Sequence, residues 1–376
     1  MSAAPIRRYD ASLREAILNA ICEGKVPKLD RLSIVRDLRA EMVAGRGACS
    51  AATFVAVLTH AFRDERDFVV WAEVIDGLRQ VELMLWDSAD PALPRAFNEL
   101  AVTLLSHVAE SLKWEAVGTD TERFRDCLLG FLLQIGHGPT LAEARRRFDL
   151  YRQARLAPAF RPGTPALPEN LKQLVFSAAA REASVPDLKP FFELHQRAVR
   201  ENDVQERAML ERALCSVAGA EAAATVLRWL SSVDVRRQDR AKHYAILARS
   251  SRAANECVAQ HVTDAYDSLC AEFDGLTMWA TMLKSVCAHL SPAAADAMRA
   301  LTRTKELSNG VHAVEQGLEE VCMRTEWRIR DEAALRELLK LGDAPLPCPP
   351  PSPALRSSPP FLHMAHAVPR MLQVAW

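Results

Sequence analysis

The stretch from Phe124 to Phe148, FRDCLLGFLLQIGHGPTLAEARRRF, most constrains the fold, because it reads as two helices joined by a tight turn. The turn is Gly136-His137-Gly138-Pro139, in which glycine permits a positive φ and proline cannot continue a helix. The first arm is apolar, and the second carries Glu143 and an arginine run. Two antiparallel helices with a short link form an αα-hairpin. We expect the rest of the chain to repeat this unit.

The remaining sequence supports this expectation through composition and spacing. Only 14 of the 376 residues are glycine, and no alternating β-type segment stands out. Helix pairs that cannot bury their apolar faces singly stack into a superhelix. We predict an all-α, HEAT- or armadillo-like α-solenoid, a superhelical array of antiparallel helix pairs. Beyond residue 168 the predicted helices are Glu169–Arg181, Val185–Arg200, Val204–Ser216, Ala220–Ser231, Arg236–Ser250, Ala253–Glu272, Leu276–His289, Pro292–Lys305, Val311–Arg328 and Asp331–Leu341.

The predicted organisation has three parts: a lead of residues 1–7, a helical domain of residues 8–341, and a Pro/Ser-rich tail of residues 342–376. The tail contains Pro349-Pro350-Pro351 and Pro359-Pro360. We expect it to be disordered or polyproline-like, because such a composition does not build a packed core. A Pro-rich loop at 157–168 interrupts the helical domain, either as a boundary between two halves or as a loop on one edge of a continuous array.

Charge balance and cysteine usage exclude several classes of protein. The formal net charge is -1, which argues against a nucleic-acid binder, since such a protein needs a basic excess. The nine cysteines include no C-x-x-C pair, so we interpret them as reduced core thiols of a cytoplasmic protein. We expect no signal peptide and no membrane span, because the N-terminus lacks an apolar segment and no apolar run is long enough.

Histidine spacing does not predict a metal site. A zinc hydrolase motif H-E-x-x-H is absent, because none of the ten histidines is followed by glutamate. Two ligands on one helix face do not hold a catalytic metal. G-x-S-x-G, P-loop and G-x-G-x-x-G motifs are also absent, so we predict no catalytic, cofactor-binding or metal-binding residue. The pairs with one-turn spacing are His107 with Glu110, His312 with Glu315, and Cys257 with His261.

Two basic clusters are the candidates for a binding surface. The first contains Arg145, Arg146, Arg147, Arg152 and Arg155, and the second contains Arg236, Arg237, Gln238 and Arg240, followed by Lys242. One interpretation is a solvated helix face whose arginines pair with nearby acids. The other is a groove wall that binds an acidic surface or a peptide carboxylate. We take the second cluster as the possible peptide or partner contact.

The ordered set of motifs resembles the C-terminal helical domain of zinc aminopeptidases of the puromycin-sensitive and endoplasmic-reticulum type. Each motif alone is mostly a packing signal, and the set in order is specific. The resemblance covers about residues 8–341, although the segment Asn255–Tyr266 lacks the tryptophans of the family pattern. The matching stretches are Arg8-Tyr9-Asp10, LDRLSIVRDLRAEMVAG, ERDFVVWAEVIDGLRQVELML, HVAESLKWEAVGTDTERFRDCLLGFLLQIGH followed by EARRRF, VRRQDRAKHYAI, and WRIRDEAALRELL.

The resemblance implies a bowl-shaped cap domain of a peptide-degrading hydrolase. In complete family members this domain covers a zinc site, closes the peptide cavity and contacts the peptide. The H-E-x-x-H and G-A-M-E-N motifs of the family's catalytic domain are absent here, so we expect no catalysis and no zinc in this chain alone. The expected partners are a peptide or an aminopeptidase catalytic core. The alternatives are an independent α-solenoid scaffold for protein interaction and a gene fragment without function.

Overall fold

The computed structural model describes residues 11–45, 49–112, 114–115, 118–157, 167–273, 277–304 and 310–340. Within these ranges the regular structure is seventeen α-helices and one short 3-10 helix, without a β-strand, which confirms the all-α prediction. The chain divides into two compact units, Met1–Gly342 and Asp343–Trp376, and the description below concerns the first. The predicted lead 1–7, residues 158–166 of the predicted loop and the whole predicted tail 342–376 lie outside the described residues.

The helices follow one another with short links. The first eight are α1 (Ala11–Cys22), α2 (Lys28–Ala44), α3 (Ala51–Ala61), α4 (Phe68–Leu85), α5 (Ala92–Ser111), α6 (Thr119–Gln134), α7 (Gly138–Leu156) and α8 (Glu169–Arg181). The 3-10 helix η1 (Pro186–Leu188) leads into α9 (Lys189–Arg200), α10 (Val204–Leu214), α11 (Ala220–Leu230), α12 (Arg237–Leu247), α13 (Arg252–Asp264), α14 (Tyr266–Phe273), α15 (Thr277–Ala288), α16 (Pro292–Thr304) and α17 (Val311–Leu338). The predicted hairpin is α6 and α7, and Gly136 between them has a φ of 81°.

Short polar side chains fix where several helices begin. The side chains of Ser50, Asp67, Asp203 and Ser251 each accept a hydrogen bond from a backbone N–H in the first turn of α3, α4, α10 and α13, respectively. Such caps satisfy donors that have no partner within the helix. Gly45 ends α2 in the left-handed conformation, with a φ of 62°, which glycine adopts without strain.

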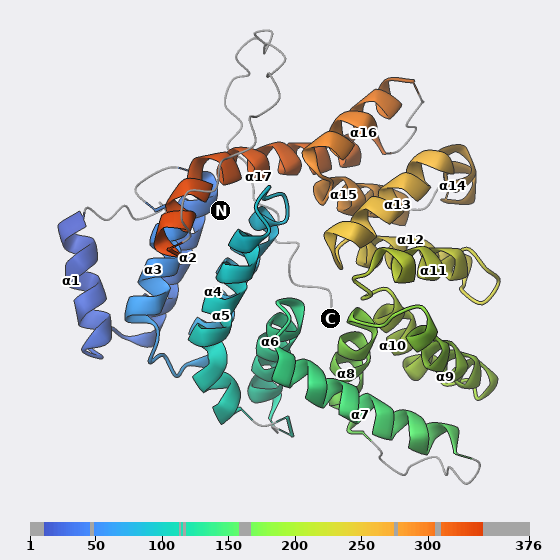
Figure 1. Cartoon of the computed structure of the whole chain (residues 1–376), viewed down its shortest axis with the longest axis horizontal. Coiled ribbons are helices and arrows are strands. Elements are labelled where there is room, and N and C mark those ends of the chain that lie inside the picture. The colour runs from blue at the N-terminus through green and yellow to red at the C-terminus, as the bar shows by residue number, and fades with distance from the viewer. Residues whose placement is uncertain are drawn as a thin grey trace. The chain divides into compact units, whose positions relative to one another are not determined.

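The helices pack in two layers. One layer is the series α2, α4, α6, α8, α10, α12, α15 and α17, in which each helix contacts the next; we call it the inner layer. In the outer layer α7 contacts α9, α11 contacts α13, and α13 contacts α16. Figure 1 shows α8, α10 and α12 nearer the middle of this unit than α7, α9 and α11. Pairs of helices stacked in two layers fit a repeat array, whereas the HEAT-like superhelix and the bowl shape stay predictions.

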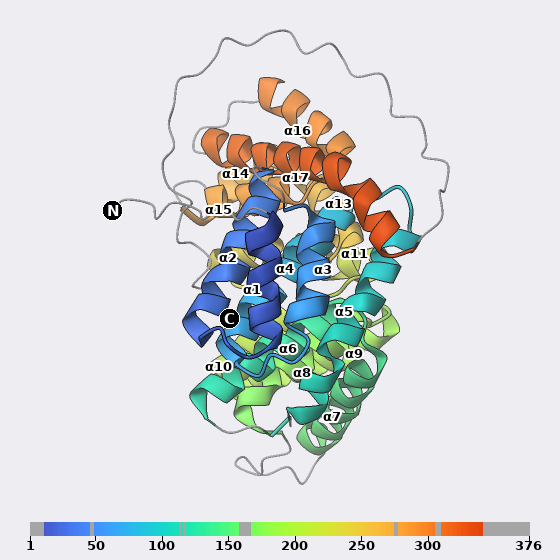
Figure 2. The same ribbon diagram turned by 90° about the vertical axis from the view of Figure 1, so that its left-hand side faces the viewer.

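The last helix returns to the first ones. α17 contacts α15 and α16 through its first half and also packs on α3 and α4. Figure 2 shows α17 crossing the N-terminal helices at one end of the unit. Its residues accordingly belong to two apolar cores: Val314 and Leu318 to the core of the later helices, Trp327 and Leu335 to the core of the earlier ones.

Two predicted boundaries are wrong. The single helix predicted over Ala253–Glu272 is two helices, α13 and α14, which divide at Ala265, and neither glycine nor proline marks the break. The two helices predicted over Val311–Arg328 and Asp331–Leu341 are the single helix α17. Asp331 resembles an N-cap residue in the sequence, but it lies within the helix and its carboxylate accepts the backbone N–H of Ala51 instead.

Candidate functional site

The predicted contact cluster lies at the start of α12, and its members differ in the contacts that they make. Arg237 donates to the backbone carbonyl of Glu272 through Nε at 2.7 Å. Arg240 pairs with the Glu272 carboxylate at 2.8 Å and donates to the backbone carbonyl of Ser232 at 2.6 Å. These two arginines therefore join the α11–α12 link to the end of α14. Arg236 and Gln238 are exposed and remain accessible to a partner.

The arginine run of α7 is largely paired with acids. Arg146 and Arg147 both donate to Glu143, at 2.7 Å each, and these hydrogen bonds lower the Glu143 pKa to about 2. Arg155 is buried and bonds Glu201 at 2.5 Å and Glu206 at 3.2 Å, so it anchors α7 to α9 and α10. The solvated-face interpretation fits Arg146 and Arg147, whereas Arg155 is part of the core.

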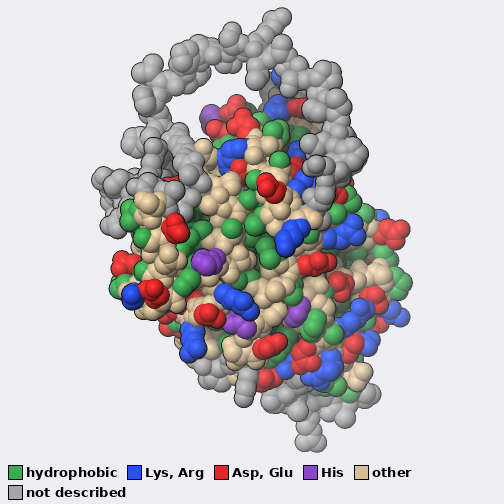
Figure 3. Space-filling view, turned by 60° about the vertical axis from the view of Figure 1, so that its left-hand side comes forward, with side chains coloured by type: hydrophobic (Ala, Val, Ile, Leu, Met, Phe, Trp, Pro, Cys, Tyr) green, Lys and Arg blue, Asp and Glu red, His purple; other side chains and the backbone are tan. Residues whose placement is uncertain are grey.

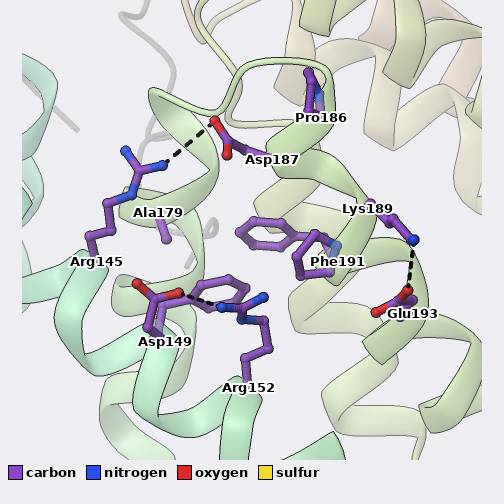
Figure 4. A pocket seen from close by; sticks show the side chains of 11 residues that line it. Arg145, Asp149, Arg152, Ala179, Pro186, Asp187, Lys189, Phe191 and Glu193 are labelled. Atoms are coloured by element: carbon purple, nitrogen blue, oxygen red, sulfur yellow. Dashed lines mark hydrogen bonds and ion pairs between the residues drawn. The ribbon is translucent and has the colours of Figure 1, made fainter.

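A cleft of about 360 Å³ lies between α7, η1 and α9 (Figure 4). The rings of Phe148 and Phe191 stack at 4.2 Å beneath it. Each cation at the rim has an acid beside it: Arg145 and Asp187 lie 3.6 Å apart, Arg152 and Asp149 3.2 Å, and Lys189 and Glu193 3.8 Å (Figure 4). A cleft with such paired charges offers no net charge for an ionic ligand. Basic and acidic side chains are likewise interspersed on the face shown in Figure 3.

A second group of arginines, not anticipated from the sequence, gathers where inner-layer helices end. We call Arg181, Arg249, Arg252 and Arg324 the arginine cluster. Arg181 ends α8 and donates to the carbonyls of Gln134 at 3.1 Å and Ser250 at 2.8 Å. Cations near the last turn of a helix satisfy free carbonyls and the helix dipole.

The other members of the cluster extend this pattern to α15. Arg324 donates to the carbonyls of Ala288 at 2.6 Å and Leu290 at 2.8 Å. Arg252 donates to the carbonyl of His289 at 2.5 Å and pairs with Asp87. The cluster therefore draws together the ends of α6, α8, α12 and α15, which are far apart in the sequence.

Burial perturbs the charged groups around the arginine cluster. It lowers the pKa of all four guanidinium groups, and it raises the pKa of the nearby Glu82 carboxyl. Burial, followed by the positive charges of Arg324, Arg249 and Arg252, lowers the His289 pKa to about 4. Solvent still reaches the exposed Arg249, which follows α12 and donates to the carbonyl of Ala245 in that helix. Partly desolvated cations of this kind favour an anion.

The residue pairs with metal-ligand spacing lie in three different surroundings. The His107 ring lies edge-on to Trp71, with centroids 5.8 Å apart, and the exposed His312 lies 3.3 Å from Glu315. Cys257 and His261 line a groove of about 650 Å³ between α11 and α13. The described residues contain no group of three or more His, Cys, Asp or Glu placed to hold a metal ion. No helix in the same part of the chain is long and apolar enough to cross a membrane.

Comparison with known proteins identifies the family. Residues 6–322 match the model of the ERAP1-like C-terminal domain. Aminopeptidase M1-D from Oryza sativa subsp. japonica is 25% identical over 338 residues, which are 88% of this chain and 37% of that protein. Aminopeptidase M1 from Arabidopsis thaliana is 26% identical over 62% of this chain and 26% of its own length. The puromycin-sensitive aminopeptidase from Caenorhabditis elegans is 25% identical over 46% of this chain and 17% of its own length.

The chain spans little more than a third of the rice protein, but the family match extends over most of the 376 residues and through nearly all the helices described above. This confirms the family resemblance drawn from the ordered motifs. The chain belongs to the ERAP1-like C-terminal domain family of M1 aminopeptidase-like proteins.

Proposed function

We propose that this chain is the helical cap of an M1 aminopeptidase-like protein, which closes the peptide cavity of a catalytic region and does not catalyse hydrolysis by itself. The match of residues 6–322 to the ERAP1-like C-terminal domain carries the proposal. The 37% coverage of the rice relative supports it, because a chain of this extent corresponds to one part of such an enzyme. Zinc chemistry then belongs to the catalytic region, and the cytoplasmic location stays a prediction.

The arginine cluster supports a more specific role in binding the carboxylate of a peptide. Guanidinium groups bind carboxylates through two parallel hydrogen bonds, and these bonds are strongest where water is excluded. Glu82 and Asp87 lie among the four arginines, and Glu182, Glu256 and Glu320 also act on them, so the role rests on the accessibility of one arginine and not on an excess of charge. Arg249 is the exposed member, and it donates a hydrogen bond to the carbonyl of Ala245 in the helix that precedes it.

The exposed pair Arg236 and Gln238 remains the other candidate contact. Arg236 precedes α12 and Arg249 follows it, so the two candidates lie at opposite ends of one helix. Arg237 and Arg240 are unsuitable probes, because their loss would also break contacts with the end of α14. Comparison of Arg236→Gln with Arg249→Gln therefore distinguishes the two ends with matched substitutions.

The test is binding of a labelled ten-residue peptide, with a free or an amidated C-terminus, measured by fluorescence anisotropy. We expect the free acid to bind more tightly than the amide. We expect Arg249→Gln to weaken binding of the free acid about tenfold, which corresponds to the loss of one charge-assisted hydrogen bond. Arg236→Gln is expected to change the affinity less than twofold. The reverse pattern would assign the contact to the start of α12, and equal binding of acid and amide would refute carboxylate recognition.

Catalysis is tested on the purified chain with aminoacyl fluorogenic substrates and added zinc. The proposal predicts turnover no greater than that of a buffer control, with or without a chelator. Robust turnover that zinc supports and a chelator abolishes would overturn the non-catalytic role.

A further inference from the structure

We propose that the second half of α17, residues 324–338, is a releasable clasp that holds the first helices to the last, and that the domain opens about α7 and α8 when the clasp is released. The inference concerns motion within the helical domain, so it does not depend on the proposed function. It rests on how the cores are divided and on the chemistry of the contacts along α17.

The described helices build two apolar cores. One contains residues of α1 to α6, and the other contains residues of α9 to α16. α7 and α8 contribute to both: Ala144 and Leu174 belong to the first core, and Phe148 and Val175 to the second. Across the described residues α17 is the other helix that contributes to both cores. The two halves are therefore joined through the chain at α7 and α8 and a second time by α17, and Trp86 and Asp87 after α4 also contact His289 and Arg252 of the later helices.

The first half of α17 packs tightly and through apolar groups. Val314, Leu318 and Val321 are buried in the second core. A Cβ atom added at Gly317 would lie 2.6 Å from Cys287 Cβ and 2.9 Å from the Ala288 nitrogen, so the backbones of α17 and α15 approach closely. Separation of this part would expose apolar surface to water and leave a cavity. We expect it to stay in place.

The second half of α17 contacts the first helices through apolar side chains, Trp327, Leu335 and Leu338, and also through a series of polar groups. Asp331 accepts the backbone N–H of Ala51 at 2.7 Å, and Arg330 donates to the carbonyl of Met42 at 2.6 Å. The Ser88 hydroxyl donates to Glu332 at 2.7 Å. Further along the helix Arg336 pairs with Asp90. These contacts reach the end of α2, the start of α3 and the turn between α4 and α5.

Asp87 connects the clasp to the start of α13. Its carboxylate lies 3.4 Å from Arg324 Nε and also pairs with Arg252. Asp87 therefore joins α4 of the first half to both α17 and the later helices. This residue couples the clasp to the arginine cluster.

Contacts of this composition can separate and re-form. Burying charges is costly, and their mutual attraction repays that cost only in good geometry, so a set of ion pairs adds less net stability than an apolar core of equal size. When the set separates as a unit, water solvates each charge again. Local opening occurs preferentially where contacts are of this kind, and packed interfaces switch between discrete arrangements. Trp327 and Leu335 are the apolar anchors that hold the closed state.

The clasp residues named above lie beyond residue 322, where the match to the family model ends. The stretch WRIRDEAALRELL within the clasp resembles the last helices of the family, but the inference does not rest on that resemblance. It comes from contacts that connect residues more than 230 positions apart, such as Ala51 with Asp331 and Ser88 with Glu332.

Hydrogen exchange of the full chain, followed by mass spectrometry, tests the clasp. The variants are Asp331→Ala and the milder Ser88→Ala with Asp90→Ala, and the control is Glu326→Ala on an exposed face of α17. We expect both clasp variants to accelerate exchange about tenfold in α17 after residue 322 and at the start of α3, because each removes a hydrogen bond to a charged group. Exchange in α11 and α13 should not change, and the radius of gyration from X-ray scattering should increase.

Uniform acceleration throughout α11 and α13, or unchanged protection of α17, would overturn the proposal, because the clasp would then not be a separate unit. If Asp331→Ala does not fold, hydrogen exchange of the Ser88→Ala/Asp90→Ala variant is judged by the same criteria. A response of Glu326→Ala equal to that of the clasp variants would also contradict it.

Discussion

At the scale of single residues, Glu211 is the most consequential buried charge. Its carboxylate lies 3.1 Å from His195 Nε2 on α9 and 3.6 Å from His243 Nε2 on α12, while Arg207 of its own helix lies 3.4 Å away. All of these groups except Arg207 are almost completely buried. One carboxylate thus holds three helices of both layers together, in a place where the sequence shows only isolated polar residues.

Glu211→Ala should lower the free energy of unfolding by about 3 kcal/mol, because it leaves buried polar groups without their partner. Urea denaturation followed by circular dichroism measures this change. Glu326→Ala, at an exposed position of α17, serves as the control and should change stability by less than about 0.5 kcal/mol. An equally small effect of Glu211→Ala would show that the network does not stabilise the fold.

The same network predicts that stability falls with acidification. Burial lowers the His243 pKa, so the unfolded chain binds a proton below about pH 6.5 that the folded chain does not. Despite its burial, Glu211 has a lowered pKa because of the hydrogen bond from His195 and the nearby charges, so its contribution is lost as the pH falls further, through its folded pKa. The urea midpoint should therefore decrease as the pH is lowered from 7 to 6 and to 5. In the His243→Gln variant the decrease between pH 7 and 6 should be smaller. An unchanged slope in that variant would remove His243 from the explanation.

At the scale of elements, the close approach of α15 and α17 depends on Gly317. Gly317→Ala should destabilise the domain by about 1 to 3 kcal/mol, because the new methyl group would meet the backbone of α15 within 2.9 Å. Gly138→Ala is the matched control, since a Cβ atom there meets nothing within 4 Å. Thermal unfolding of the two variants measures the difference. Equal melting temperatures would contradict a tight contact between the helices.

Most helices could be predicted from the sequence, because apolar spacing and caps are local signals. The predicted helix Glu169–Arg181 coincides with the observed α8. The predicted division between Arg328 and Asp331 is wrong, because Asp331 lies within α17 and its partner is the N–H of Ala51, which only the folded chain brings near. The arginine cluster was missed for the same reason: Arg181 and Arg249 lie 68 positions apart and meet only when their helices stack.

The choice of Arg236, Arg237, Gln238 and Arg240 as a contact site shows a second limit of local reasoning. The sequence displays a basic run but not the carbonyls and the carboxylate at the end of α14 that occupy two of its members. A charged cluster in a sequence therefore indicates a surface only after its partners in the fold are known.

At the scale of the whole molecule, the helical domain is two stacked layers whose last helix returns to the first. The chain belongs to the ERAP1-like C-terminal domain family and spans 37% of the rice relative, and on this basis we propose that it acts with a catalytic region. The central claim is therefore that this chain works as the cap of an aminopeptidase and not as an independent scaffold. The catalytic region would be identified by its H-E-x-x-H motif.

Capture of the native protein from its own cells after chemical crosslinking, with identification by mass spectrometry, tests this claim most directly. The account predicts a polypeptide that contains H-E-x-x-H, either continuous with this chain or crosslinked to its helices, together with chelator-sensitive aminopeptidase activity in the captured material. Recovery of the chain with unrelated partners only, and without any such polypeptide or activity, would contradict the account and favour the scaffold.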